Sequence, residues 1–356
     1  MWHYLITLRR YARALSKSKR IGYVGAQGNM NLGDEVLCDV MRILLSDFGI
    51  YPYRATRRDL IIESLVPHRK LVNCLCLGGG TIIGKPLYLP PVRELLKRNL
   101  PAFSLGTGVI NPEFWRHCAP WFQDQQREWI RSLKSFEEVT VRGPISQQIL
   151  AGQGIESTVV GDPALLLLED GIPSPPNRRI LGVNIGTSLG LIYGEDEEKV
   201  VLGVVKACTE LQKHGWEIQV YSIWPMDDAY STFLAQSLAQ PAKIFRYYTN
   251  VRLFKRQVSR CSVFLGMKLH ATILALCSHV PSIMLEYRPK CRDFMVSVGL
   301  ERYCIRTDEL GGQNLASLVE VASEQRSEIQ QVFRAAAHVY KNKLHCLAER
   351  IRQAVS

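Results

Sequence analysis

Short apolar runs rich in Val, Ile and Cys alternate with helix-length amphipathic segments along most of this chain. Such alternation is typical of parallel β-sheets whose strands are joined by crossover helices, so we predict an α/β fold. In the first half the predicted strands are 21–26, 72–77, 102–105, 139–142 and 157–160, and the predicted helices are 34–47, 92–99, 115–133 and 145–151. In the second half the predicted strands are 180–185, 217–222, 243–246, 263–265 and 282–285, and the predicted helices are 197–213, 229–239, 253–259, 270–278 and 291–298.

A proline-rich segment divides the two series. Residues 169–177 hold three prolines and one glycine, a composition typical of linkers between domains. Because 356 residues suffice for two α/β domains of ordinary size, we predict two Rossmann-like domains facing a cleft. The predicted parts are a basic amphipathic helix at 1–20, an N-terminal Rossmann-like domain at 21–168, a linker at 169–178, a C-terminal Rossmann-like domain at 179–312, and one or two helices at 313–356.

The composition excludes several classes of protein. Hydrophobic residues make up 47% of the chain and charged residues 22%, which is typical of a globular protein rather than a disordered or fibrous one. No stretch approaches the roughly 18 consecutive apolar residues of a membrane span, and the first residues lack the pattern of a secretory signal. Most cysteines lie in apolar segments, as buried free thiols do in a reducing compartment. We therefore predict a cytoplasmic protein.

We expect neither a metal ion nor an organic cofactor. Cys74 and Cys76 are separated by a single residue, which is closer than the usual zinc-binding spacing. The glycine-rich loop at 25–34 follows the first predicted strand, but its glycines do not have the spacing of a dinucleotide-binding loop.

The first 20 residues carry six positive charges and no acid, out of a net charge of +11. Apolar residues recur among them at near-helical spacing, so a basic amphipathic helix is predicted. It either lies on an anionic membrane surface, at the inner face of the cell membrane, or packs on the domain through Trp2 and Leu5. Nucleic acid is not expected as a partner, because the rest of the chain shows no basic stripe with interleaved aromatic residues.

Loops that follow strands are the candidate sites in the first half, since open α/β sheets bind ligands beyond the carboxyl ends of their strands. Asp34 either caps the next helix or binds and deprotonates an acceptor hydroxyl. The three glycines before Thr81 either expose backbone donors to a ligand or serve a tight turn. Arg142 ends a strand and is expected to reach the cleft, whereas Asp162, directly before a proline, is expected to be structural.

Lys268 and His270 stand between a predicted strand end and a predicted helix start in the second half. Lysine, histidine and a helix N-terminus together form a favourable place for an anion. Histidine also transfers protons near neutral pH, so we predict a functional role for this loop. The next strand is followed by Glu286, Tyr287, Arg288 and Lys290, which are expected at the same edge of the sheet.

Taken in order, these loops resemble the polysaccharide pyruvyltransferase family. The matching elements are Gly28-Asn29 with Gly33-Asp34, Gly78-Gly79-Gly80, Val141-Arg142-Gly143 with Ser146, Gly161-Asp162-Pro163-Ala164, Leu269-His270-Ala271, and Tyr287 with Lys290. The resemblance implies a glycosyltransferase-B-like fold. It also implies transfer of a pyruvyl group from phosphoenolpyruvate to two hydroxyls of a sugar, as a cyclic ketal, on a cell-surface polysaccharide or its lipid-linked precursor.

The resemblance also implies roles for individual residues, with acceptor binding in the N-terminal domain and donor binding in the C-terminal one. His270 and Asp34 are expected to be catalytic. The expected donor-binding residues are Lys268, Leu269, Tyr287, Lys290, Arg288 and Asn184. The expected acceptor or cleft loops contain Asn29, Gly78, Gly79, Gly80, Thr81 and Arg142.

This sequence departs from the family at two positions. Arginine is common there at the positions of Lys268 and Gly186. Lysine binds a carboxylate as a point charge, without the two-pronged contact of arginine. Two alternatives stay open: a glycosyltransferase that uses a nucleotide sugar, with Glu286 holding the ribose, and a relative without catalytic activity.

Overall fold

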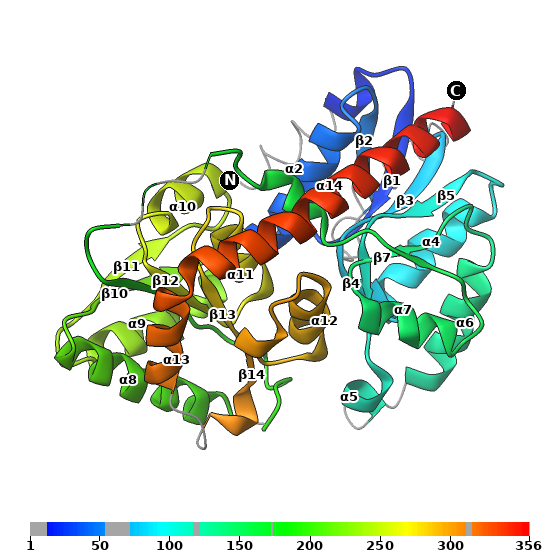
Figure 1. Ribbon diagram of the computed structural model, residues 1–356. Coiled ribbons are helices and arrows are strands. Elements are labelled where there is room, and N and C mark those ends of the chain that lie inside the picture. Colours follow the sequence, from blue (N-terminus) through cyan, green and yellow to red (C-terminus); the bar gives the residue numbers. More distant parts are fainter. Residues whose placement is uncertain are drawn as a thin grey trace. The chain divides into compact units, whose positions relative to one another are not determined.

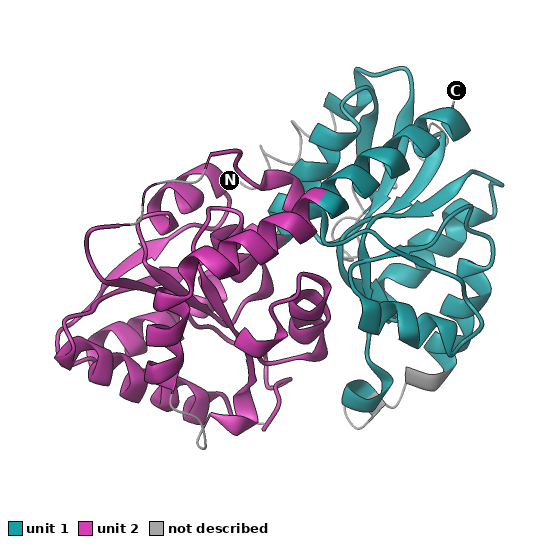
Figure 2. Cartoon of the chain, viewed as in Figure 1, with its two compact units in different colours: residues 1–29, 34–163, 339–356 teal, residues 30–33, 164–338 magenta. Residues whose placement is uncertain are grey.

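In the computed structural model, the structure describes residues 13–53, 72–116, 122–171, 174, 176–194, 196–310 and 315–355 (Figure 1). The chain forms two compact units, shown in different colours in Figure 2. Unit 1 comprises Met1–Asn29, Asp34–Pro163 and Val339–Ser356, and unit 2 comprises Met30–Gly33 and Ala164–His338. Most of the predicted N-terminal helix, residues 1–12, lies outside the described residues, so its membrane contact stays a prediction.

Unit 1 contains two four-stranded parallel sheets, with the orders β2-β1-β3-β5 and β4-β6-β7-β8. The strands are β1 (Arg20–Val24), β2 (Gly49–Tyr53), β3 (Cys74–Leu77), β4 (Gly80–Ile83), β5 (Ala102–Ser104), β6 (Thr107–Val109), β7 (Thr140–Val141) and β8 (Thr158–Val159). The helices are α2 (Leu32–Leu44), α4 (Leu89–Leu96), α5 (Pro112–Arg116), α6 (Phe122–Leu133) and α7 (Pro144–Ala151). Strand β3 reads Cys-Leu-Cys-Leu and is buried throughout, as expected of a strand covered on both faces.

Unit 2 contains one six-stranded parallel sheet. Its strands are β9 (Ile180–Asn184), β10 (Glu217–Ser222), β11 (Lys243–Arg246), β12 (Val263–Gly266), β13 (Ser282–Glu286) and β14 (Cys304–Arg306). Its helices are α8 (Glu197–Lys213), α9 (Asp228–Ser237), α10 (Val251–Val258), α11 (Leu269–Leu276), α12 (Pro289–Ser297), α13 (Leu315–Glu324) and the first part of α14 (Arg326–Val355), which continues into unit 1.

The strand order of unit 2 contains a topological switch point. Along the sheet the order is β11-β10-β9-β12-β13-β14, so the chain builds outward from β9 in one direction and then from β12 in the other. The connections that leave β9 and β12 therefore diverge, and ligands of open α/β sheets bind in the crevice at this point. A ligand of unit 2 is therefore expected at the loops after β9 and β12.

Short sequence signals fix where the helices of unit 2 begin. Asp196 precedes α8, and its carboxylate accepts a hydrogen bond from the N–H of Lys199 at 3.0 Å. Asn250 caps α10 in the same way, by accepting the N–H of Leu253 at 3.0 Å. Helix α12 begins at Pro289, where proline is favoured because its missing N–H has no partner inside the helix.

The predicted strands and helices are confirmed in both halves except at 115–133, where α5 and α6 are found and residues 117–121 lie outside the described residues. The C-terminal segment forms two helices, α13 and α14. Four strands were missed: β2, β4, β6 and β14. Strand β2 contains Pro52, which argues against a strand in sequence alone, and β4, β6 and β14 are only three or four residues long. No helix among the described residues is long and apolar enough to cross a lipid bilayer.

The chain passes from unit 1 to unit 2 after Pro163, ahead of the linker predicted at 169–178. The intervening residues pack into unit 2. The side chains of Ala164 and Leu165 are fully buried, and the ammonium of Lys255 donates a hydrogen bond to the carbonyl of Leu167 at 2.5 Å. These contacts explain why the division falls before the prolines rather than among them.

An aromatic cluster should dominate the stability of unit 2. Phe254 is fully buried and lies edge-on to Tyr221 and Phe264, with ring centroids 5.7 and 6.3 Å away. Phe254→Ala should lower the free energy of unfolding by about 3–5 kcal/mol. Phe233→Ala, at a position 48% exposed on α9, should change it by less than about 0.5 kcal/mol. Urea denaturation followed by tryptophan fluorescence measures both, and equal transition midpoints would contradict the prediction.

Candidate functional site

The loops after β9 and β12 start side by side. Strands β9 and β12 pair in parallel, and Asn184 at the end of β9 is opposite Gly266 at the end of β12. The next residues, from Ile185 and from Met267 onward, therefore leave the sheet at neighbouring points. The backbone N–H of Met267 donates to the carbonyl of Asn184 at 2.9 Å, which extends the pairing beyond the strand.

Asn184 holds the backbone of Lys268 in place. Its side-chain oxygen accepts the N–H of Lys268 at 2.9 Å, and its side-chain amide donates to the carbonyl of Tyr221 at 2.8 Å. Asn184 is fully buried, so these bonds use both ends of its amide group. Asn184 thus orients the residue that precedes helix α11, and its predicted contact with the donor stays a prediction.

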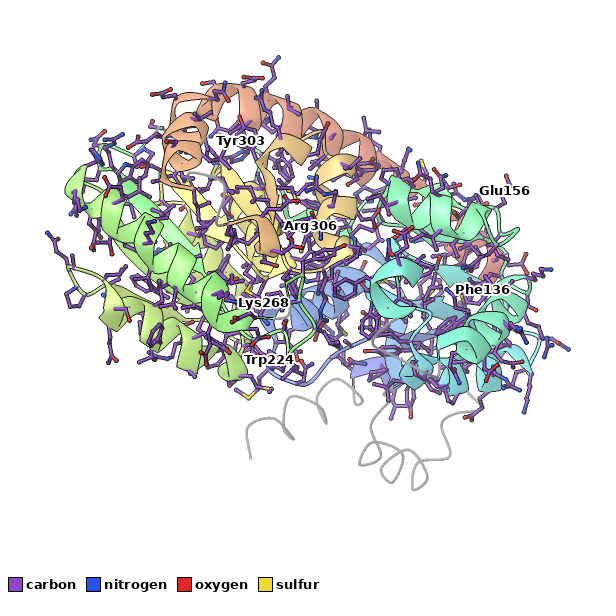
Figure 3. The ribbon with its side chains drawn as sticks, turned by 90° about the horizontal axis from the view of Figure 1, so that it is seen from below. Phe136, Glu156, Trp224, Lys268, Tyr303 and Arg306 are labelled. Atoms are coloured by element: carbon purple, nitrogen blue, oxygen red, sulfur yellow. The ribbon has the colours of Figure 1, made fainter. Side chains whose placement is uncertain are left out.

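The ammonium of Lys268 lies among four groups from three other loops. It is 3.0 Å from an oxygen of Asp227, and it donates to the carbonyl of Thr187. It also lies 5.1 Å from the ring centre of Trp224 and 6.0 Å from that of Tyr287. Lys268 and Trp224 are labelled in Figure 3. The side chain of Lys268 keeps 10% of its surface exposed.

Asp227 was not found by sequence reasoning. It follows β10 in the segment Trp224-Pro-Met-Asp-Asp228, and its side chain is fully buried. Besides Lys268, it accepts the backbone N–H of Thr187 at 3.1 Å. Burial raises the pKa of Asp227 to about 6, although Lys268 lowers it. A pair of acids directly after a predicted strand was the available signal.

Gly186 is a glycine because Asp227 occupies the adjacent space. A Cβ atom at position 186 would lie 2.1 Å from Oδ1 of Asp227, far inside contact distance. No side chain fits there while Asp227 keeps its place. Arginine is common at this position in the resembled family. In this chain the space beside Gly186 is occupied by the carboxylate of Asp227, which pairs with Lys268.

His270 is the second residue of α11 and is half-buried. Its ring packs on the backbone of Gly33, where a Cβ atom would lie 2.4 Å from Nδ1 of His270. The segment 30–33 belongs to the same unit, and the N–H of Leu32 donates to the carbonyl of Ile223 at 3.0 Å. The loop that carries the predicted Gly33 thus forms one wall of the histidine's surroundings. The side chain of Leu269, also predicted to bind the donor, is buried.

The loop after β13 brings further cations to Tyr287. The guanidinium of Arg288 lies 5.2 Å from its ring centre and the ammonium of Lys290 lies 4.9 Å from it. Arg288 also donates to the carbonyls of Leu191 and Ser188. Tyr287, Arg288 and Lys290 therefore lie together, as the sequence predicts, and Lys268 shares the same ring.

Glu286 forms an ion pair inside unit 2. Its side chain is 3% exposed and lies 2.6 Å from the guanidinium of Arg292. Burial raises the pKa of Glu286, although Arg292 opposes this shift. A carboxylate so placed is poorly suited to hold a ribose, which weakens the nucleotide-sugar alternative.

The loop after β9 is folded around Glu197, another residue missed from the sequence. Its carboxylate accepts the hydroxyl of Thr187 at 3.0 Å and the N–H groups of Ser188 and Gly190 at 2.5 and 3.2 Å. Leu189 has a φ of 58°, which these contacts stabilise. The carbonyls of Thr187 and Ser188 are thereby turned toward Lys268 and Arg288.

The glycines of the 78–80 loop have packing reasons in unit 1. A Cβ atom at Gly78 would lie 2.4 Å from the ring of Tyr23, and one at Gly79 would lie 2.7 Å from Leu37. Gly80 has a φ of 94°, which side chains rarely allow. These contacts support the turn interpretation of the loop rather than a bed of backbone donors for a ligand.

The other predicted residues of unit 1 contact one another. Arg142 and Asp162 are both fully buried, 3.8 Å apart, and Arg142 donates to the hydroxyl of Thr81 at 3.3 Å. Ligand contact by Arg142 stays a prediction. Asp34 lies inside α2 rather than at its cap, and it accepts the amide of Asn29 at 2.9 Å.

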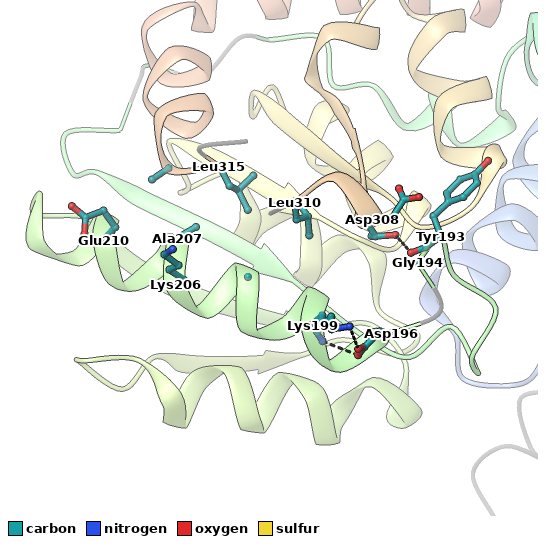
Figure 4. Close-up of a pocket in the computed structure, with 13 residues that line it drawn as sticks. Tyr193, Gly194, Asp196, Lys199, Lys206, Ala207, Glu210, Asp308, Leu310 and Leu315 are labelled. Atoms are coloured by element: carbon teal, nitrogen blue, oxygen red, sulfur yellow. Dashed lines mark hydrogen bonds and ion pairs between the residues drawn. The ribbon is translucent and has the colours of Figure 1, made fainter. Parts of the chain in front are cut away.

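A cavity of about 770 Å³ lies elsewhere in unit 2, between α8 and the segment around residue 308 (Figure 4). Its lining includes Tyr193, Lys199 and Asp308, and Lys199 is paired with Asp196 at 3.1 Å. The predicted donor-binding residues do not line it. Tyr193 links this cavity to the loop after β13, because its N–H donates to the carbonyl of Tyr287 at 3.1 Å.

Several solved structures are similar in fold at low sequence identity. UDP-GlcNAc 2-epimerase from Neisseria meningitidis, bound to UDP-GlcNAc, aligns with a TM-score of 0.55 at 11% identity, over 95% of this chain and 99% of that one. MnaA from S. aureus, in a structure with UDP, gives 0.59 at 11% identity, over 94% and 95%. The spinosyn rhamnosyltransferase SpnG, with spinosyn aglycone, gives 0.50 at 14% identity, over 95% and 100%. These neighbours confirm the predicted α/β fold of two parallel-sheet domains, which is glycosyltransferase-B-like.

The sequence itself matches a family model. No curated protein matches the chain, but the model for polysaccharide pyruvyl transferase matches residues 31–289, well over half of its length. The matched range includes the loops after β9, β10, β12 and β13. This chain therefore belongs to the polysaccharide pyruvyl transferase family and is a transferase.

Proposed function

We propose that this transferase moves a pyruvyl group from phosphoenolpyruvate to two hydroxyls of a sugar, at the loops that leave the switch point of unit 2. The observation that carries the proposal is the position of His270 in the first turn of α11, two residues after Lys268, which precedes the helix. A proton donor, a cation and a helix N-terminus are the groups that an anionic enol ether requires.

The chemistry begins with a proton transfer to carbon. His270, as imidazolium, donates a proton to the methylene carbon of phosphoenolpyruvate, which leaves the adjacent carbon electrophilic. One sugar hydroxyl attacks this carbon and its proton returns to His270, which restores the imidazolium, and the second hydroxyl then displaces phosphate to close the ketal. The methylene becomes the methyl of the ketal, and the second hydroxyl proton leaves with phosphate. No redox step is involved.

The cations supply the binding of the donor. Lys268, Arg288 and Lys290 all lie around the ring of Tyr287, and they oppose the negative charge of a phosphate and a carboxylate. Acceptor binding by Asn29 and Asp34, both in unit 1, stays a prediction from the sequence. We further propose that the acceptor belongs to a polysaccharide or its lipid-linked precursor.

Removal of the histidine tests the proton donor. His270→Ala should lower the turnover number by about 10²–10⁴-fold, with little change in the Michaelis constant for phosphoenolpyruvate. Phosphate release with candidate acceptor sugars measures both constants. His338→Ala, at an exposed position of α14, is the matched control and should retain full activity. Near-normal turnover in His270→Ala would exclude the histidine as the acid.

Gly33 should position His270 by contact. Gly33→Ala introduces a Cβ atom 2.4 Å from Nδ1, so the ring must move and kcat should fall about 10²-fold. Gly203→Ala is the matched control, because a Cβ atom on that face of α8 meets nothing closer than 3.9 Å.

The double variant separates this positioning role from a general loss of folding. In a His270→Ala background, Gly33→Ala should cause no further loss, since the side chain that it displaces is already absent. Additive losses in the double variant would show that Gly33 acts through something other than His270.

A further inference from the structure

In unit 2, the ion pair of Lys268 and Asp227 is more deeply buried than that of Arg292 and Glu286. The carboxylate of Asp227 is fully buried, and the ammonium of Lys268 keeps 10% exposure. The pair is therefore asymmetric: Lys268 is the member that a ligand reaches, and Asp227 lies behind it.

The carboxylate of Asp227 receives few hydrogen bonds from the groups around it. One of its oxygens accepts from Lys268 at 3.0 Å and from the N–H of Thr187 at 3.1 Å. Its second oxygen, Oδ2, is buried and has no hydrogen-bond partner among the described residues. A buried carboxylate oxygen without a donor favours the protonated form, because the neutral group loses less on leaving water.

The backbone at Gly186 closes the remaining side. It approaches Oδ1 of Asp227 so closely that a Cβ atom there would lie 2.1 Å away. The carboxyl group can therefore respond to a change in the charge near Lys268 by taking up a proton, but not by turning toward solvent.

We propose that Asp227 sets the charge of the anion site at Lys268, so that an anion binds tightly there only with uptake of one proton by Asp227. With Asp227 ionised, the pair is neutral and a second anion near Lys268 is repelled by the carboxylate. With Asp227 protonated, the ammonium charge is unopposed and available to a phosphate or carboxylate. The burial that raises the pKa of Asp227 to about 6 brings this transition close to neutral pH.

The other charged groups around Asp227 do not change state in this range. On α9, burial raises the pKa of Asp228, but hydrogen bonds from Ser222 and Tyr248 outweigh this effect and hold the pKa below its usual range. On α8, hydrogen bonds from Ser188 and Gly190 hold the pKa of Glu197 low, again against burial.

Tyr287, at the end of β13, stays neutral, because burial raises its pKa. Asp227 is thus the carboxyl in contact with Lys268 whose charge changes near pH 6.

This inference rests on the proposed function only in naming phosphoenolpyruvate as the natural anion. The test therefore uses sulfate, which keeps the same charge throughout the range, whereas a phosphate ester titrates near pH 6 itself. Sulfate affinity of the intact chain is measured by titration calorimetry between about pH 5 and pH 8. Above about pH 6 the dissociation constant should rise by up to tenfold per pH unit, and below it the constant should level off.

Asp227→Asn removes the carboxylate and keeps its shape. In this variant sulfate should bind at about pH 8 roughly 10- to 100-fold more tightly than in the unchanged protein, with a weaker dependence on pH. All other side chains are the same in both proteins, so the difference between the two curves isolates Asp227.

Two further variants complete the design. Asp228→Asn is the matched control, because that carboxylate bonds to Ser222 and Tyr248 instead, and it should leave the pH dependence intact. Lys268→Met should abolish sulfate binding at all pH values.

Proton uptake supplies a measurement that needs no variant. Calorimetry in two buffers of different ionisation enthalpy should count close to one proton taken up per sulfate at about pH 7.5 and close to none at about pH 5. The inference is overturned if no proton is taken up, if affinity is flat with pH, if Asp227→Asn has the same pH dependence, or if sulfate does not bind. If sulfate behaves as expected and phosphoenolpyruvate is not turned over, the proposed function fails while this inference stands.

Discussion

The parallel pairing of β9 with β12 is the interaction on which the site of unit 2 depends. It sets Asn184 opposite Gly266, so that one side-chain amide holds the backbone of Lys268 just before α11. Because the two strands diverge in their connections, the loop ends remain open to a ligand while their starts are fixed. The position of Lys268 is thus determined by main-chain geometry before its side chain makes any contact.

Polar groups of the neighbouring loops hold the cations near β9 and β12 in place. Glu197 gathers the N–H groups of the loop after β9, which turns two carbonyls toward Lys268 and Arg288. Those carbonyls and Asp227 leave the cations oriented but only partly neutralised. In the proposed anion site the donors are therefore already placed, so that binding of the anion would not require long side chains to become ordered.

The fold could be predicted from the sequence, and the loop after β12 could be selected as a candidate site. Among the described residues, alternating apolar runs located every strand except β2, β4, β6 and β14. The loop after β12 was selected because lysine, histidine and a helix start lie within three positions. Asp227 was missed because its partner Lys268 lies in a distant segment of the chain. Glu197 was missed because its contacts with Thr187 and Ser188 depend on how the intervening loop folds. The proximity of Arg142 to Asp162 could likewise not be predicted from the sequence.

Packing explains several glycines whose role the sequence did not indicate. Runs of glycine were interpreted through backbone freedom or ligand contact, yet Gly33, Gly78 and Gly186 each lie where a side chain from another segment fills the Cβ position. At Gly33 that side chain is His270, and at Gly186 it is Asp227, so two of these glycines leave room for side chains of the candidate site. Close packing against a functional side chain constrains a residue type as strongly as φ does, but it leaves no local pattern in the sequence, because the neighbour that imposes it lies in a distant segment.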